Sequence, residues 1–150
     1  MTISQKSQYA VRALLVLAQY QGTGPVKAAR IASAQSIPLR FLENILGELK
    51  QARLVESVRG KEGGYFLRGQ PEAISVGDVI RLTEGPMHPA GRVAGRSVAE
   101  GRTRDLGGVL LPVWEKAQKA MMDVYDQTTL RDLLEHELAA RESRGLNYAI

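Results

Sequence analysis

The segment PLRFLENILGELKQARLVESVRGKEGGYFL, from Pro38 to Leu67, carries the strongest structural signal in the chain. Its first half has apolar residues at the i, i+3, i+4, i+7 spacing of an amphipathic helix, which predicts a helix over residues 38 to about 52. The apolar face of this helix consists of Leu42, Ile45, Leu46 and Leu49. The second half has two β-prone runs, LVESV and YFL, around the turn-forming RGKEGG, and it therefore predicts a β-hairpin.

Two further helices are predicted upstream of this segment. Residues 5–20 repeat small and aliphatic side chains at helical spacing, and Gly22 and Gly24 end that helix. Residues 26–35 (VKAARIASAQ) predict a shorter helix, which a brief break separates from Pro38. Two helices joined by so short a turn form a helix-turn-helix pattern. Many helical pairs share that pattern, so the hairpin that follows carries the specificity.

The turn of the predicted hairpin is both basic and rich in glycine. Arg59 and Lys61 charge it, while Gly60, Gly63 and Gly64 permit positive φ angles and close approach of the backbone. A basic tip placed directly after an amphipathic helix suits contact with phosphates or insertion into a minor groove. The alternative is an ordinary glycine-rich hairpin whose charges only keep it soluble. The order of helix and hairpin favours a winged helix-turn-helix that binds DNA.

Downstream, residues 75–84 predict a short helix with Ser75 as its N-cap. The composition then changes to a long loop over residues 85–108, which holds six glycines, two prolines and four arginines. Residues 109–127 predict a long helix, and a shorter helix follows, capped by Thr128 or Thr129. The tail beyond residue 141 is expected to fray.

The helix over residues 109–127 carries an apolar stripe that is too large for an isolated helix to leave in water. A second copy of the chain would cover this stripe, since two-fold homodimers are the commonest oligomers. Packing on the first helix of the same chain is the alternative, and both are expected to contribute. The residues predicted to form the dimer interface are Leu110, Val113, Trp114, Ala117, Met121, Val124 and Tyr125.

Composition excludes several classes of protein. The 150 residues include no cysteine, so disulfides and cysteine-bound metals are ruled out, and His88 and His136 lie far apart. No metal and no cofactor is therefore predicted. The polar start of the chain and the lack of a long apolar run predict a cytoplasmic protein without a membrane span. Residues 1–84 hold eleven Lys and Arg against seven Asp and Glu, as a nucleic-acid footprint requires.

Four segments together resemble a family of bacterial winged-helix regulators, which includes the iron–sulfur cluster regulator, the nitrite-sensitive repressor and the cysteine-metabolism repressor. They are SQYAVRALLVLA, IPLRFLENILGELKQARLVESVRGKEGGYFL, ISVGDVIRLTEG and TTLRDLL. The resemblance covers nearly the whole chain. It implies a mainly α fold with a small β-hairpin and a long C-terminal dimerisation helix. The expected parts are a winged helix-turn-helix domain (1–84), a loop at the family's sensor position (85–108), the dimerisation helix with a short following helix (109–142) and a tail (143–150).

The resemblance also implies residues that contact DNA. Glu43 could accept a hydrogen bond from a cytosine amino group, Asn44 could pair with adenine, and Arg40 suits guanine or a phosphate. Alternatively, Glu43 pairs with a neighbouring cation and Asn44 is only solvated. Arg59 matches the wing arginine that reaches the minor groove. The complete expected set is Arg40, Phe41, Glu43, Asn44, Arg59, Gly60, Lys61, Gly63 and Gly64.

The loop departs from the family. Sensing members place three cysteines there to hold an iron–sulfur cluster, and the matching positions here fall near Arg92, Val98 and Arg104. Arginine cannot ligate iron, so no cluster is expected. Three schemes of control remain: an anionic metabolite bound by the loop, a partner protein, or constitutive binding controlled by abundance. Simple disorder of the loop is an equally good alternative. The residues that would bind an anion are Arg92, Arg96, Arg102 and Arg104.

The favoured function is a sequence-specific transcriptional regulator, most simply a repressor, that binds a pseudo-palindromic operator in double-stranded DNA as a homodimer. The alternative is a protein-interaction adapter that has kept the scaffold and no longer binds DNA specifically. An enzyme is not expected, because the chain has no phosphate loop, nucleophile elbow or metal motif. Asp123 and Asp126 are helical neighbours on a solvated face rather than a catalytic pair.

Overall fold

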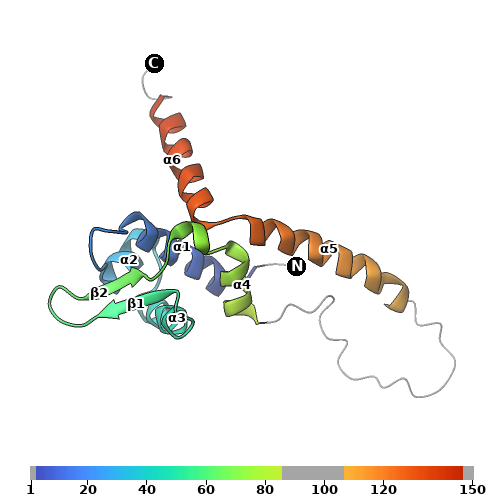
Figure 1. Ribbon diagram of the computed structural model, residues 1–150, viewed down its shortest axis with the longest axis horizontal. Helices are drawn as coiled ribbons and strands as arrows, with labels where there is room; N and C mark the ends of the chain where they lie inside the picture. The colour runs from blue at the N-terminus through green and yellow to red at the C-terminus, as the bar shows by residue number, and fades with distance from the viewer. Residues whose placement is uncertain (1–2, 86–106, 147–150) are drawn as a thin grey trace.

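The computed structural model describes residues 3–85 and 107–146, and Figure 1 shows their arrangement. Helices dominate, with a single two-stranded antiparallel sheet in the described part of the chain. The elements are α1 (Gln5–Gln19), α2 (Ala28–Gln35), α3 (Leu39–Gln51), β1 (Val55–Val58), β2 (Gly64–Leu67), a 3-10 turn (Pro71–Ala73), α4 (Val76–Glu84), α5 (Gly107–Gln127) and α6 (Leu130–Leu146). The predicted mainly α fold with a small hairpin is confirmed.

Helix α1 is the central element of the core. It packs against α2, α3, α4, α6 and β2, and its buried side chains Leu14 and Leu17 are at most 1% exposed. Burial of a leucine side chain contributes roughly 1.5–3 kcal/mol, so this helix anchors the domain. The largest side chains buried with it are Ile31, Leu42, Ile45, Leu46, Leu49, Val55, Val79, Ile80 and Leu130.

The turn between α2 and α3 has a defined geometry. Ser36 ends α2 in the left-handed conformation, with φ of 52°. The amide of Ile37 then donates a hydrogen bond of 2.9 Å to the carbonyl of Ala32, and the Ile37 side chain is buried. This pairing satisfies a free carbonyl at the end of α2. Pro38 is the N-cap of α3, so that helix begins one residue later than predicted.

The hairpin β1–β2 is the wing, which we define as Val55–Leu67. Its register pairs Val55 with Leu67 and Val58 with Gly64. An isolated bridge joins Tyr65 to Val26, just before α2, through two backbone hydrogen bonds of 2.8 Å. The wing is therefore attached to the start of α2 as well as to the end of α3.

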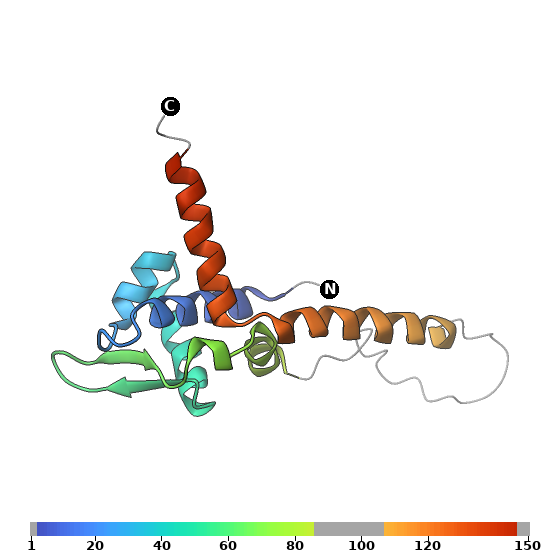
Figure 2. The same cartoon turned by 45° about the horizontal axis from the view of Figure 1, so that its top comes forward.

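The two C-terminal helices leave the body in different directions (Figures 1 and 2). Thr129 caps α6, because its hydroxyl accepts a hydrogen bond from the amide of Asp132 while the Asp132 carboxylate accepts one from the amide of Thr129. The predicted short helix is wrong in length: α6 has 17 residues and continues to Leu146, past the expected fraying point. A regular helix extends as long as each residue adds a further backbone hydrogen bond.

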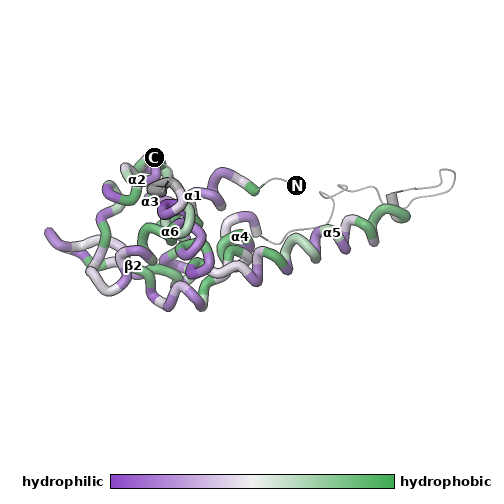
Figure 3. The backbone as a smooth tube through the Cα atoms, turned by 90° about the horizontal axis from the view of Figure 1, so that it is seen from above, coloured by the Kyte–Doolittle hydropathy of each residue, from purple (hydrophilic) through white to green (hydrophobic). Residues whose placement is uncertain are grey.

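The expected packing of the long helix on α1 is also wrong. Within the chain α5 packs mainly against α4, and it is α6 that packs on α1. Arg81 of α4 holds α5 through Asp126, with 2.7 Å between the charged atoms. Figure 3 shows that α5 continues away from the body with apolar positions along its length. Its periodicity predicted the apolar stripe correctly, but α6 rather than α5 covers α1.

Candidate nucleic-acid interface

The outward side of α3 presents three polar residues, which we call the recognition face: Arg40, Glu43 and Asn44. All three are exposed, whereas Leu42 and Ile45 beside them are buried. Within residues 3–85 and 107–146, Glu43 forms no ion pair, so the alternative that it neutralises a neighbouring cation finds no support. Its carboxylate is free to accept a hydrogen bond from a ligand. The amphipathic spacing of α3 placed these residues outward, as predicted.

Phe41 occupies a different side of α3. Its ring lies edge-on to the ring of Tyr9 on α1, with 5.9 Å between centroids, and 42% of the residue is exposed. Further along the helix, Glu48 pairs with Lys6 of α1 at 2.7 Å. This flank of α3 therefore faces α1. Among the predicted DNA-contacting residues of α3, Phe41 is shared between the exposed surface and the packing on α1.

Arg12 of α1 braces the turn that precedes α3. Its Nε donates a hydrogen bond of 3.1 Å to Gln35 Oε1, and Nη2 donates a second to the Gln35 carbonyl. The guanidinium group also lies 5.5 Å from the centre of the Tyr9 ring. Gln35 is the last residue of α2, so these contacts fix the turn between the two helices. No pattern in the sequence indicated this role for Arg12.

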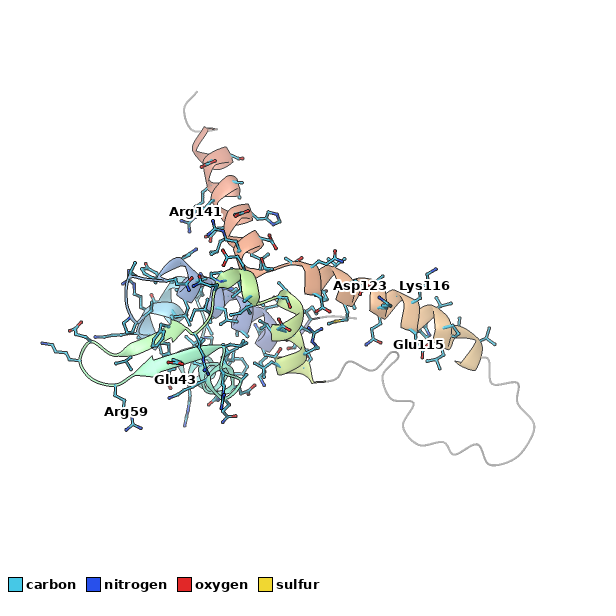
Figure 4. All side chains as sticks on the ribbon, in the orientation of Figure 1. Glu43, Arg59, Glu115, Lys116, Asp123 and Arg141 are labelled. Carbon is cyan, nitrogen blue, oxygen red and sulfur yellow. The ribbon has the colours of Figure 1, made fainter. Side chains whose placement is uncertain are left out.

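The tip of the wing carries its charges in the open. Arg59 and Lys61 are exposed, and Figure 4 shows Arg59 projecting outward from the hairpin. Gly60 has a φ of 109°, a conformation that favours glycine, and its carbonyl accepts a hydrogen bond of 3.0 Å from the amide of Gly63. Gly60 thus permits the turn that presents the two cations.

Gly63 and Gly64 serve a different purpose from Gly60, because neither has a positive φ. A β-carbon on Gly63 would collide with the carbonyl of Val58. One on Gly64 would lie 2.6 Å from the carbonyl carbon of Val26. Both glycines are required for close backbone packing at the base of the turn.

A groove that sequence reasoning missed lies between the wing and the start of α2. We call it the basic groove, and its volume is about 730 Å³. Lys27 and Lys50 line it together with Arg59 and Lys61. Lys27 and Lys50 are separated by a whole helix and a turn in the sequence, so no spacing rule connects them. The residues that line the groove are Lys27, Ala28, Lys50, Ser57, Val58, Arg59, Gly60, Lys61, Gly63, Gly64 and Tyr65.

The predicted dimer stripe on α5 is largely open within one chain. Trp114 is 49% exposed and Val124 is 61% exposed, while Met121 and Tyr125 are half-buried. Leu111, which was not predicted, is also exposed, at 42%, beside the stripe. The polar side of the helix carries Glu115, Lys116 and Asp123, labelled in Figure 4. One protomer leaves much of the predicted stripe uncovered, and its exposed residues are Leu110, Val113, Trp114, Ala117 and Val124.

The predicted effector arginines, Arg92, Arg96, Arg102 and Arg104, lie outside the described residues, as does His88. The segment that carries them follows a polar cluster, which we call the clasp and which consists of Ser4, Ser7, Thr83 and Glu84. The buried hydroxyl of Ser7 donates a hydrogen bond of 2.5 Å to Glu84, and the Ser4 amide donates another of 2.9 Å. Hydrogen bonding by Ser4 and Ser7 lowers the pKa of Glu84.

Known proteins resemble this chain over nearly its whole length. A sequence profile of the Rrf2 family, described as iron-dependent transcriptional regulators, matches residues 3–136. The HTH-type transcriptional regulator CymR of Bacillus subtilis is 34% identical over 143 residues, or 95% of this chain and 96% of CymR. IscR of Sodalis glossinidius is 35% identical over 137 residues, which cover 91% of this chain and 81% of that protein.

Solved structures agree with the sequence matches. T. potens IscR superposes with a TM-score of 0.72 and 36% identity, over 91% of this chain and 88% of IscR. The structure of B. subtilis CymR, described as the global cysteine regulator of that organism, superposes with a TM-score of 0.68 and 32% identity. That match covers 91% of this chain and 98% of CymR. The fold is therefore that of winged-helix regulators with a C-terminal helix.

The iron in the family's description can be tested against the donors of this chain. The sequence has no cysteine and two histidines, and of these only His136 on α6 lies within the described residues. In those same residues, no group of three His, Cys, Asp or Glu side chains could hold a metal ion. Cysteine thiolates are the usual ligands of iron–sulfur clusters. The residues present do not fit such a cluster.

The family match extends over most of the chain, and CymR and IscR each share about a third of their aligned residues with it. No helix in the described ranges is long and apolar enough to cross a membrane. The relatives are regulators of transcription rather than enzymes. The chain belongs to the Rrf2 family of bacterial DNA-binding transcriptional regulators, and it lacks the cysteines of the members that carry a cluster.

Proposed function

We propose that this protein is a homodimeric repressor that binds a pseudo-palindromic operator without a cysteine-ligated iron–sulfur cluster. The observation that carries the proposal is the exposed recognition face of α3 beside a wing with an exposed basic tip. A helix of this kind enters the major groove, and its polar side chains reach the edges of the bases. If the repressor occupies its operator without a cluster, its occupancy would depend on the amount of the protein or on a bound ligand.

The recognition face supplies the chemistry of base discrimination. The carboxylate of Glu43 accepts a hydrogen bond from a cytosine amino group, and the amide of Asn44 matches the two polar atoms of adenine. Arg40 matches guanine or a phosphate. Arg59 lies on the wing, where its charge suits the negative potential of a narrow minor groove. Sequence is read by α3, and the wing adds affinity and a preference for groove shape.

The open stripe of α5 supports a homodimer. Exposed apolar patches of this extent on a helix usually mark an interaction surface, and a second copy presents the same stripe in a self-complementary way. By helical spacing, Lys116 and Asp123 fall on the opposite side of α5 from Trp114, which leaves the stripe free to pack. Two recognition helices related by a dimer axis would read half-sites roughly one helical turn, ~34 Å, apart.

Control of DNA binding is proposed to come from an anion or a partner protein rather than from a cluster. The segment that would bind either one is rich in arginine and follows α4 directly. Its Arg92, Arg96, Arg102 and Arg104 would suit a metabolite with carboxylate or phosphate groups. A regulatory protein that docks on the same segment is the other candidate.

The test is the binding of the purified, full-length protein to a fluorescent fragment of its own promoter region and to a scrambled fragment, over a range of salt concentrations. Arg59→Ala should weaken binding and lower its salt dependence, because one cation fewer faces the DNA. Glu43→Ala should lower the preference for the promoter fragment. Arg141→Ala, on α6 and paired with Glu137, is the matched control and should change neither.

Equal affinity of the wild-type protein for promoter and scrambled DNA would overturn the proposed function. In that case the retained fold would serve a protein partner instead, as an adapter. Selective binding by wild type with an unchanged Glu43→Ala variant would leave the function standing and would remove Glu43 from base recognition. The two outcomes are distinguished by the wild-type measurement alone.

A further inference from the structure

The basic groove has an unusual distribution of charge. Four cationic side chains line it, and no carboxylate does. Lys27 approaches from the start of α2, Lys50 from the last turn of α3, and Arg59 and Lys61 from the wing. Cations from three separate elements therefore line one space, which gives it a positive electrostatic potential.

The cations of the groove are available to a ligand. Lys27, Arg59 and Lys61 are exposed, and none of them forms an ion pair in the part of the chain that the structure describes. Lys50 donates a hydrogen bond of 2.6 Å to the hydroxyl of Ser57 on β1, which orients its ammonium group beside the wing. Glu62, the nearest carboxylate in the sequence, does not line the groove.

The walls of the groove are held in place by backbone contacts. The bridge between Val26 and Tyr65 ties β2 to the residue before Lys27, with both hydrogen bonds at 2.8 Å. Gly64 packs so closely here that a β-carbon would lie 3.0 Å from the amide nitrogen of Lys27. Three glycines line the groove, so its wing side has little side-chain bulk. An extended ligand could therefore approach the backbone.

The shape of the groove indicates a polymeric anion. It is open to solvent along the surface, and it includes Arg59 and Lys61 of the wing tip as well as Lys50 of α3. The basic groove of the protein thus runs from α3 to the wing. These two elements are proposed to enter the major groove and the adjacent minor groove of the DNA. The DNA backbone that separates a major groove from the adjacent minor groove must pass between those two elements.

We propose that the basic groove holds the phosphodiester backbone of one DNA strand, with Lys27 and Lys50 as phosphate ligands. The inference rests on the proposed function and adds two residues to it. Lys27 and Lys50 contribute affinity and set the register of the protein on the duplex, but they do not read sequence, since phosphates are the same at every base pair. Lys27 also extends the interface to α2, which the recognition face and the wing tip alone would not reach.

The experiment compares the full-length Lys27→Gln and Lys50→Gln variants with wild type on the promoter fragment and on scrambled DNA. Each variant should bind both fragments about fivefold more weakly, so that the ratio between them is unchanged. The slope of log K against log salt should become shallower by about 0.9 for each phosphate that a variant no longer neutralises. Lys116→Gln, an exposed lysine on the polar side of α5, is the matched control and should keep the wild-type slope.

A second measurement identifies the phosphates. Each duplex would carry one neutral methylphosphonate in place of one phosphate. At the phosphate that Lys27 contacts, this change should weaken the binding of wild type relative to the unmodified duplex. It should not weaken the binding of Lys27→Gln, because that variant makes no charged contact there. Lys27→Arg should again bind the methylphosphonate duplex more weakly than the unmodified one. Thermal unfolding of each variant, which should match wild type, shows that any weakening is not a folding defect.

The outcomes separate the two proposals. If wild type does not prefer its promoter, the proposed function fails. If wild type is selective but both lysine variants keep the wild-type salt slope, the groove proposal is overturned and the proposed function stands. The groove proposal is also overturned if every methylphosphonate affects wild type and Lys27→Gln equally. A variant that lowers the promoter preference would show that its lysine reads bases instead.

Discussion

Ser7 and Glu84, 77 residues apart in the sequence, are joined by a hydrogen bond of 2.5 Å between the Ser7 hydroxyl and the Glu84 carboxylate. Ser7 is fully buried near the start of α1, and Glu84 is the last residue of α4. The contact ties α1, on which α3 packs, to the end of α4.

Ser7→Ala should lower the free energy of unfolding by roughly 1–3 kcal/mol, because it removes a buried hydrogen bond to a charged group. Chemical denaturation measures this change. Ser143→Ala is a matched control, since Ser143 is an exposed helical serine whose hydroxyl donates to the carbonyl of Ala139. That substitution should stay within about 0.5 kcal/mol of wild type. Equal effects of the two substitutions would contradict a stabilising clasp.

The Glu84 carboxylate should make stability depend on pH. Hydrogen bonding by Ser4 and Ser7 lowers its pKa below the ordinary value of 4.5. A carboxyl group with a depressed pKa in the folded state contributes stability above its unfolded pKa and loses it as pH falls through the folded value. Wild type should thus exceed Glu84→Gln in stability near neutral pH, and the two should converge in acid.

Urea titrations of wild type and Glu84→Gln at several pH values would follow this convergence. Glu62→Gln removes an exposed carboxylate of the wing tip, outside the clasp, and is the matched control. If the difference in the free energy of unfolding between wild type and Glu84→Gln instead grew toward acid pH, the pKa of Glu84 would be raised by folding. That result would contradict a lowered pKa.

Arg12 should act on DNA binding through position rather than contact. Arg12→Lys retains the charge but cannot keep both hydrogen bonds to Gln35, so the turn before α3 should loosen. Operator affinity should fall about tenfold, equivalent to roughly 1.4 kcal/mol, while the salt slope stays at the wild-type value. Fluorescence anisotropy at several salt concentrations measures both quantities. A reduced slope would mean that Arg12 touches a phosphate.

Gly64→Ala should displace the wing from the start of α2. The added β-carbon would lie 2.6 Å from Val26 backbone atoms, which cannot rotate away. Overpacking of this kind costs roughly 1–3 kcal/mol. Gly69→Ala is the matched control, because a β-carbon at that position would have nothing within 4 Å and the φ of Gly69 is not positive. Thermal unfolding should distinguish the two, and equal melting temperatures would contradict close packing at Gly64.

Trp114→Glu should break the proposed dimer. A tryptophan at the centre of an interface commonly contributes about 2 kcal/mol or more, so dimerisation should weaken by roughly 30-fold or more. Lys116→Glu places the same residue on the polar side of α5 and should leave the dimer intact. Sedimentation velocity measures both variants. A wild-type protein that stays monomeric at high concentration would refute the role of the stripe.

Local patterns made much of the fold predictable. The spacing of Leu42, Ile45, Leu46 and Leu49 indicated α3 and its buried face, and the β-prone runs around a glycine-rich turn indicated the wing. Ser75 was expected to cap α4, and it forms a capping box with Asp78. These features depend on residues close together in the chain, so that their spacing carries the information. The recognition face follows from the same periodicity.

The partner of each apolar stripe was not predictable in the same way. Apolar positions recur along both α5 and α6, and their spacing does not say which element each helix packs against. The structure packs α6 on α1 and α5 on α4, and an ion pair between Arg81 and Asp126 joins the second pair of helices. Ser7 likewise looks like an ordinary helical serine until Thr83 and Glu84 are brought beside it.

The order of the elements, the buried sides of the first helices, the basic wing tip and the absence of cysteine ligands all follow from the amino-acid sequence without any coordinates. Periodicity, turn residues and composition act over a few positions or over the whole chain, and they need no knowledge of distant contacts. Tertiary packing was needed to bring Lys27 beside Lys50 and Arg59, and Arg12 beside Gln35. Such neighbours are set by how helices pack on α1, because the burial of several stripes at once selects one arrangement.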